Sequence, residues 1–237
     1  MRKRTLSEEG VHLYLNGMTS TIPTKKLFCN LFHSDYDDRL ESVVENCRES
    51  TKCLCVNFDD PELRERLDAG ILHTVRLVLT RDQKIMKKKY AYRNYNFFLD
   101  VMKRAFEEND HQTASMIAIA LNDPAISRLP IKKPKKAEQC IQNVLDSHGW
   151  ANANKHMKYL QEVNDVRVLP SLITFAIYLK RQQCFGLDKK AQQAELLLKK
   201  YKNMVVDQSK VLPIYKQKRL KREELMQLSA ALKHVYS

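Results

Sequence analysis

The chain has 237 residues and a formal net charge of +13, which is enough chain for one large domain or for a domain with a small appendage. Its 5 Gly and 7 Pro provide too few turns for a sandwich or barrel of many strands, and long segments rich in Lys, Glu, Leu and Ala favour helices. No run of 18 apolar residues occurs, so no membrane-spanning helix is predicted. We therefore predict an all-α protein.

The first 60 residues alternate short apolar and polar stretches. We expect short helices and loops there, which pack on a main body formed by residues 61–237. The charged beginning has no apolar segment behind it, unlike a secretory signal, so we expect a cytoplasmic protein. The main body is predicted to open with a helix that Asp60 caps and Pro61 begins, since these residue types are common at those places.

A wide apolar stripe predicts the next helix, at 93–109. A further helix begins after Asp110 and His111 and ends at Asn122, a residue type that tolerates the left-handed conformation found at helix ends. Asp123 is then a good N-cap, and Pro124 suits the first helical position. The sequence therefore predicts a tight corner that presents the side chain of Asn122 outward.

Two prolines and four lysines fill the connection 130–136, which we expect to be exposed. Later helices are predicted at 141–149, at 154–163, in the apolar segment 167–185, and at 188–204. The last predicted helix carries an apolar stripe formed by Leu225, Leu228, Leu232 and Val235.

Enzyme motifs are not found in the sequence, which has no P-loop, no G-x-G-x-x-G, no H-E-x-x-H and no G-x-S-x-G. The seven His are scattered, and Cys53 and Cys55 form a C-x-C without a second pair at zinc-finger spacing. We therefore predict reduced thiols, no metal site and no cofactor. Binding of a partner is favoured over covalent catalysis.

Positive charge gathers in three short clusters, at 84–89, 132–136 and 216–222. Each cluster alone is typical of a solvated surface. Together they favour an anionic partner, which can be nucleic acid, a membrane surface or an acidic protein.

Two segments carry a family resemblance: NYNFFLDVMKRAFEENDHQTASMIAIALNDPAISRL (94–129), which fits most closely at ALNDPAISRL, and NKHMKYLQEVNDVRVLPSLITFAIYLKR (154–181). In their order, and in the register of Tyr159 and Pro170, they resemble the catalytic domain of Ras-family guanine-nucleotide exchange factors (RasGEF). The similarity covers about residues 70–205.

The resemblance implies an all-helical bowl from which a helical hairpin projects, between roughly Leu172 and Leu198. Exchange factors of this family bind the nucleotide-free GTPase more tightly than the loaded form, and so speed the release of GDP. Their hairpin opens the first switch segment of the GTPase while the core grips the second. The implied function is nucleotide exchange on a Ras-superfamily GTPase, without covalent chemistry or a cofactor.

Asn122 matches the corner Asn whose amide meets the GTPase in the family, although a helix cap alone would also explain this residue. Lys155 and His156 align with two positions that contact the partner, but the family's Asn-Phe pair is not kept. Tyr159 is expected in the core.

The hairpin departs from the family pattern, because its acidic segment is missing. Phe185 is expected to replace the apolar wedge, and Asp188 the carboxylate near the Mg²⁺ and phosphate sites, each shifted by one position. The predicted exchange residues are Asn122, Gln183, Leu187 and Asp188, and the predicted partner contacts are Asn122, Lys155, His156, Lys180, Cys184 and Phe185.

The altered hairpin leaves open a second function, that of a RasGEF-fold scaffold that binds a GTPase without exchange. A basic helical nucleic-acid binder ranks last and is not expected, because the lysine clusters lack interleaved aromatic residues. Peripheral association with an anionic membrane is expected through Lys132, Lys133, Lys135 and Lys136. The composition also suggests a bacterial effector delivered into the host cytoplasm.

Overall fold

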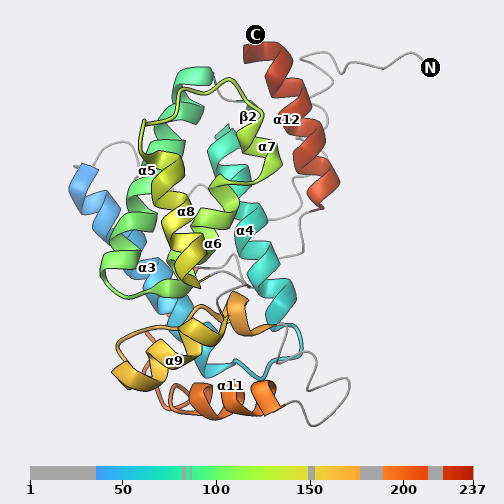
Figure 1. Ribbon diagram of the computed structural model, residues 1–237. Coiled ribbons are helices and arrows are strands. Elements are labelled where there is room, and N and C mark those ends of the chain that lie inside the picture. Colours follow the sequence, from blue (N-terminus) through green and yellow to red (C-terminus); the bar gives the residue numbers. More distant parts are fainter. Residues whose placement is uncertain are drawn as a thin grey trace.

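The computed structural model describes residues 36–81, 84–85, 87–148, 153–176, 189–212 and 221–236. This part of the chain is mostly helical, as predicted, with one antiparallel pair of two-residue strands (Figure 1). None of its helices is long and apolar enough to cross a membrane. The elements are α3 (Tyr36–Val56), α4 (Leu63–Leu79), β1 (Thr80–Arg81), β2 (Lys84–Ile85), α5 (Lys88–Glu107), α6 (His111–Leu121), α7 (Pro124–Ser127), α8 (Ala137–His148), α9 (Ala153–Val163), α11 (Lys189–Lys199) and α12 (Arg222–Tyr236).

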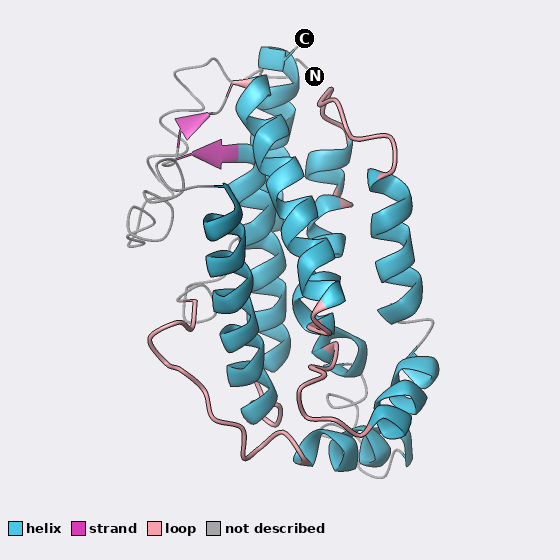
Figure 2. Cartoon of the chain, turned by 90° about the vertical axis from the view of Figure 1, so that its left-hand side faces the viewer, coloured by secondary structure: helices cyan, strands magenta, loops and turns pink. Residues whose placement is uncertain are grey.

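Helix α6 lies at the centre of a bundle of long helices. After His111 and Gln112 its sequence, TASMIAIAL, is small or apolar on every side, so nearly all of its residues can be buried, and it packs against α4, α5 and α8. Helix α3 lies against α5, and α12 packs on α4 and α7. Figure 2 shows the long helices running lengthwise, and Figure 1 places α9 and α11 across one end of them.

The buried side chains form two clusters. The larger one fills the bundle of α4, α5, α6, α8 and α12. The smaller one lies where α9, the helical segment 172–176 and α11 meet the adjoining ends of α3 and α4. Met116 of α6 belongs to the smaller cluster, so the central helix contributes to both. Tyr201 is fully buried in it, and its hydroxyl donates to the carbonyl of Val168 at 2.7 Å.

A short backbone bridge joins the two clusters at the start of α6. The N–H of Leu169 donates to the carbonyl of Asn109 at 2.9 Å, and the N–H of His111 donates to the carbonyl of Leu169 at 3.1 Å. Asn109 has a φ of 60°, a left-handed conformation that Asn adopts more readily than most residues. Arg48 of α3 binds next to this bridge, where it donates to the carbonyl of Glu108 at 2.9 Å.

The prediction of short N-terminal helices is wrong for residues 36–56, which form the single 21-residue helix α3. Its buried face contains Glu49, Ser50 and Thr51 beside only a few apolar residues, so the hydrophobic period was weak. A buried partner on α6 satisfies one of these polar groups, since the hydroxyls of Thr51 and Thr113 lie 3.1 Å apart.

Other predictions hold with shifted ends. The apolar stripe at 93–109 is confirmed in α5, which begins earlier, at Lys88. Helix α4 begins at Leu63 rather than Pro61, because the Asp60 carboxylate accepts from the Glu62 N–H and holds a turn before the helix.

The prediction of an apolar stripe on the last helix is partly wrong. Leu225, Leu228 and Leu232 are buried in α12, but Val235 is 45% exposed. Tyr236 takes the next buried position instead, because it follows Leu232 by four residues and therefore returns to the same helix face.

Candidate partner-binding site

The corner between α6 and α7 is built by Asp123 and Pro124. Asp123 caps α7 as predicted, with its Oδ1 accepting from the N–H of Ala125 at 2.8 Å, and Pro124 occupies the first turn. The prediction of a left-handed Asn122 is wrong, because this residue has φ −89° and ψ −1°. Proline ends α6 here by keeping the residue before it out of the helical region, and Asp123 is accordingly extended.

Helix α12 lies beside α7 (Figure 1) and holds this corner in place through a second set of polar contacts. Nη2 of Arg222 lies 2.5 Å from Oδ2 of Asp123, whose side chain is only 1% exposed. Arg128 donates through Nε to Oγ of Ser229 at 2.8 Å, and the Ser229 hydroxyl donates to the carbonyl of Ala125 at 2.5 Å. The backbone of the corner is therefore fixed from both sides.

Most residues of the run ALNDPAISRL stabilise this corner. Its apolar members are buried in the larger cluster: Ala120, Leu121, Ala125, Ile126 and Leu129. Its charged members, Asp123 and Arg128, bond to α12. These residues need no partner to explain them.

Two polar residues of this run, Asn122 and Ser127, are exposed, and Asn122 is the one at the corner itself. Its backbone N–H donates to the carbonyl of Ala118 at 3.1 Å, but its side chain is exposed. Four residues make the side-chain hydrogen bonds at the corner: Asp123, Arg128, Arg222 and Ser229. Within the described ranges, the side chain of Asn122 makes none. The amide is therefore presented to solvent, with its donor and acceptor available, from a fixed backbone.

Helix α9 places its two predicted contact residues differently. Lys155 is exposed, whereas His156 is 1% exposed, which corrects the prediction that its ring contacts a partner. Nε2 of His156 accepts from the backbone N–H of Ser171 at 3.0 Å, and its ring stacks on Phe175 at 5.6 Å between centroids. His156 therefore anchors α9 to the segment that follows it. Tyr159, predicted to be in the core, is partly buried against the same cluster.

The predicted hairpin is described only at its two bases. The segment 172–176 is helical, with Leu172 and Phe175 fully buried. Helix α11 buries a residue on each turn and lies against α9. The predicted tip, 177–188, lies outside the described residues, and with it Lys180, Gln183, Cys184, Phe185, Leu187 and Asp188.

Asn122 is the C-cap of α6, and Figure 1 shows α7 and α11 at opposite ends of that helix. The start of α6 bonds to Leu169, next to the smaller cluster, and its end leads into α7. Eleven residues of helix separate the two places, which is about 16 Å at a rise of about 1.5 Å per residue. A single partner that touches both must therefore span at least about 16 Å, which a protein does.

Buried ionisable groups lie inside the fold rather than at this surface. Burial raises the pKa of the Asp110 carboxyl to about 6, although the Thr113 N–H that donates to its Oδ1 at 3.0 Å opposes the rise. Burial also lowers the pKa of His73 to about 4, with Arg76 adding to the effect. No group of three His, Cys, Asp or Glu suited to a metal ion occurs in the described part of the chain.

Sequence reasoning missed the residues that hold the corner from α12. Arg222 lies 99 positions from Asp123, and Ser229 lies 101 positions from Arg128. Neither side chain carries a local signal of its role, because a surface Arg and a helical Ser are common everywhere. Asp123 did carry a local signal of its role as a helix cap, because Asp followed by Pro is typical of a helix start.

Comparison with protein-family models, with curated proteins and with solved structures gives no match for this chain. Its function is therefore inferred from its residues and their geometry.

Proposed function

We propose that this chain binds a Ras-superfamily GTPase and accelerates the release of its GDP. Residues 94–129 and 154–181 resemble the RasGEF catalytic domain, and the described helical fold is compatible with that resemblance. The chain would act by binding the nucleotide-free GTPase more tightly than the loaded form, which lowers the free energy of the intermediate through which GDP leaves. This mechanism requires no covalent step.

The exposed amide of Asn122 is the observation that carries the proposal. It stands on a corner that α12 holds rigid, within a run whose charged side chains, Asp123 and Arg128, are bonded internally. An amide both donates and accepts, which suits the polar backbone of a switch segment. Because the corner is already ordered, binding there costs little conformational entropy.

The remaining contacts in this proposal come from a wide surface. Lys155 on α9 is exposed, and Leu196 on α11 is 72% exposed, so both can face a partner at the end of the molecule opposite the corner. Phe185 would act as the apolar wedge and Asp188 as the carboxylate directed at the Mg²⁺ and phosphate sites. A protein partner that spans the length of α6 would touch Asn122, Lys155 and Leu196.

Binding without exchange is the second candidate, and the burial of His156 favours it. A ring that anchors α9 internally cannot also reach a GTPase, so one of the two contacts aligned on α9 is lost. The chain would then hold a GTPase as a scaffold without stabilising its empty state.

The test is release of fluorescent GDP from a panel of Ras, Rap, Ral, Rab and Rho proteins. We expect acceleration for at least one member. Asn122→Ala should weaken binding of that GTPase about tenfold, because it leaves polar groups of the partner without a hydrogen bond at the interface. Asn143→Ala, the same change at an exposed position on α8, is the matched control and should change nothing.

Stable binding of one GTPase without faster release of its GDP would favour the scaffold function over nucleotide exchange. Absence of both binding and acceleration across the panel would refute the proposal. Asp188→Ala separates the roles, since it should reduce exchange more than binding. Equal small effects from Asn122→Ala and Asp188→Ala would show that the site lies elsewhere.

A further inference from the structure

Lysines from three separate segments meet at one end of the bundle. They come from the start of α5, from the loop 130–136 between α7 and α8, and from the last turn of α12, which lie together at the top of Figure 1. Nζ of Lys88 bonds to the carbonyl of Tyr236 at 3.2 Å, which joins the first and third segments directly. We name this surface the lysine end; its members are Lys87, Lys88, Lys89, Lys132, Lys133, Lys135, Lys136 and Lys233.

The lysine end has little compensating charge. Lys133 lies 3.6 Å from Glu138, which is itself exposed. Four of the other lysines are exposed and, within the described ranges, belong to no ion pair: Lys87, Lys132, Lys135 and Lys136. Elsewhere on the surface, lysines pair with carboxylates, as Lys199 does with Glu195 and Lys210 with Glu45.

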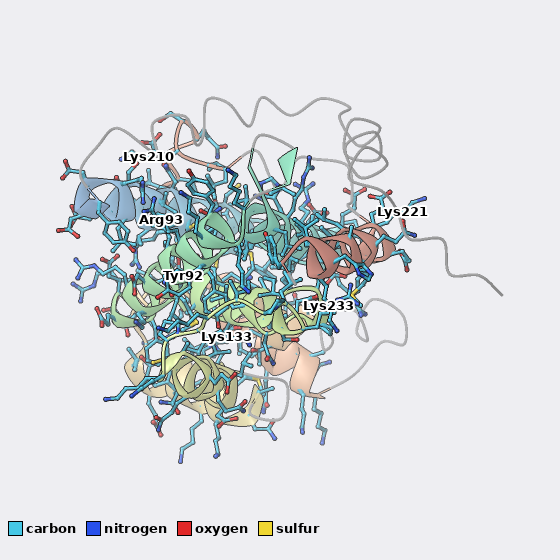
Figure 3. All side chains as sticks on the ribbon, turned by 90° about the horizontal axis from the view of Figure 1, so that it is seen from above. Tyr92, Arg93, Lys133, Lys210, Lys221 and Lys233 are labelled. Carbon is cyan, nitrogen blue, oxygen red and sulfur yellow. The ribbon has the colours of Figure 1, made fainter. Side chains whose placement is uncertain are left out.

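The loop that carries half of these lysines is anchored. Ile131 is buried in the larger cluster, and its N–H donates to the carbonyl of Leu129 at 2.8 Å. Pro134 ends the loop with a turn, in which its carbonyl accepts from the N–H of Ala137 at 3.0 Å. The lysines between these anchors are therefore held at the surface. Figure 3, which views the molecule from above, shows Lys133 of this loop and Lys233 of α12 on the same end.

Helix ends of both signs lie at the lysine end. Both α5 and α8 begin there, which places the positive ends of their dipoles at this surface, whereas α12 ends there with its negative end, where the carbonyl of Tyr236 accepts from Lys88. The fold thus gathers on one face eight lysines that come from three distant parts of the sequence.

We infer that the lysine end binds the surface of a membrane that contains anionic phospholipids. Such a surface requires only a cluster of exposed basic side chains on one face, and no groove. Nucleic acid fits less well, because the cations come from a loop and from helix ends rather than from one helix that could enter a groove. The nearby ring of Tyr90 already has Lys89 at 4.9 Å and Arg93 at 5.9 Å over it, so it offers little face for stacking of a base.

The test is co-sedimentation with vesicles of phosphatidylcholine and phosphatidylserine, with vesicles of phosphatidylcholine alone as the neutral reference. The variant carries Gln at Lys87, Lys132, Lys135 and Lys136, which keeps most of each side chain and removes four charges. A basic residue near an anionic membrane contributes about fivefold to partitioning, so the four together should reduce binding by at least about tenfold. The control carries Gln at four exposed lysines at the other end of the molecule, Lys158, Lys189, Lys190 and Lys199.

Binding of the wild-type chain to the anionic vesicles only, with loss in the first variant and retention in the control, would support the inference. An equal loss in both variants would overturn it, since net charge alone would then explain binding. Absence of binding to anionic vesicles would also overturn it. Duplex DNA presented at the same charge concentration is the third arm, and tighter binding to it through the same four lysines would assign the surface to nucleic acid instead.

Discussion

Replacement of Asp110 by Asn should stabilise the protein at neutral pH. Asp110 caps the first turn of α6, where its Oδ1 accepts from the Thr113 N–H at 3.0 Å, and the residue is only 1% exposed. Burial raises the pKa of this carboxyl to about 6, so at neutral pH the chain folds with a costly buried charge. Asn is also a good N-cap and carries no charge.

The size of the effect follows from the pKa. A rise from 3.8 to about 6 corresponds to about 3 kcal/mol of unfolding free energy, because each pKa unit is about 1.4 kcal/mol. Thr113 and Arg48 favour the carboxylate and lower its pKa, and the value of about 6 already includes their effects. The gain from Asp110→Asn is therefore about 3 kcal/mol above pH 7.

The pH dependence has a definite sign. Between pH 3.8 and about 6 the folded state binds more protons at Asp110 than the unfolded state, so this residue's contribution to stability is present below pH 3.8 and is lost as the pH rises through about 6. The Asn variant does not titrate there. The difference in unfolding free energy between variant and wild type should therefore grow from about pH 4 to pH 7 and then stay constant.

Urea unfolding followed by circular dichroism at several pH values between 4.5 and 8 measures this difference. Asp165→Asn is the control, because Arg167 lowers the pKa of that exposed carboxyl, and its small effect should have the opposite sign. A difference for Asp110→Asn that stays constant with pH would show that burial does not raise the pKa of this carboxyl, and one that falls as the pH rises would show that the folded state favours the carboxylate; either result would refute the reasoning.

Three further outcomes are expected. His73 contributes a loss of stability as the pH falls from 6.5 to about 4, because burial lowers its pKa in the folded state and the unfolded state binds its proton first; this loss opposes the gain from Asp110. His73→Gln should remove the His73 contribution, so the variant should gain stability relative to the wild type over that range, and a constant difference between their urea midpoints would contradict this. Arg222→Ala should lower the free energy of unfolding by about 1–2 kcal/mol, because it leaves the buried carboxylate of Asp123 unpaired. The effect is no larger because the Arg222 side chain is itself 60% exposed, and an unchanged midpoint in urea would show that the pair contributes nothing. Iodoacetamide should modify the partly exposed Cys53 before the fully buried Cys47, whose pKa burial raises to about 12, and mass spectrometry of the native protein should give that order.

Local features of the fold were predictable from the sequence. The stripe from Phe97 to Ala105 on α5 and the cap of α7 by Asp123 depend on residues a few positions apart, and both are confirmed. The end of α6 was placed correctly but for the wrong reason, since Pro124 ends that helix without a left-handed Asn122. Spacing and proline chemistry act over one or two turns, which is the range of sequence that such reasoning sees.

Long-range packing was not predictable in the same way. Whether His156 faces solvent depends on the segment that folds back over α9, because its Nε2 accepts from the N–H of Ser171. The buried face of α3 contains Thr51, whose hydroxyl has its partner on α6 in Thr113, and Ser50, whose hydroxyl accepts from the distant N–H of Leu212. Periodicity of apolar residues carries no information on such polar partners.

The two proposals can be joined through their geometry, because the loop 130–136 of the lysine end directly follows the corner that presents Asn122. A chain held by its lysine end would keep that corner close to the membrane, where a GTPase attached to the same membrane is at a raised effective concentration. Exchange on a GTPase tethered to anionic vesicles should then be faster than in solution, and Gln at the four lysines Lys87, Lys132, Lys135 and Lys136 should remove this gain while leaving the rate in solution unchanged. If the lysine variant also loses exchange in solution, the lysine end touches the GTPase itself. If the gain on vesicles survives the four substitutions, the membrane contact lies elsewhere on the chain.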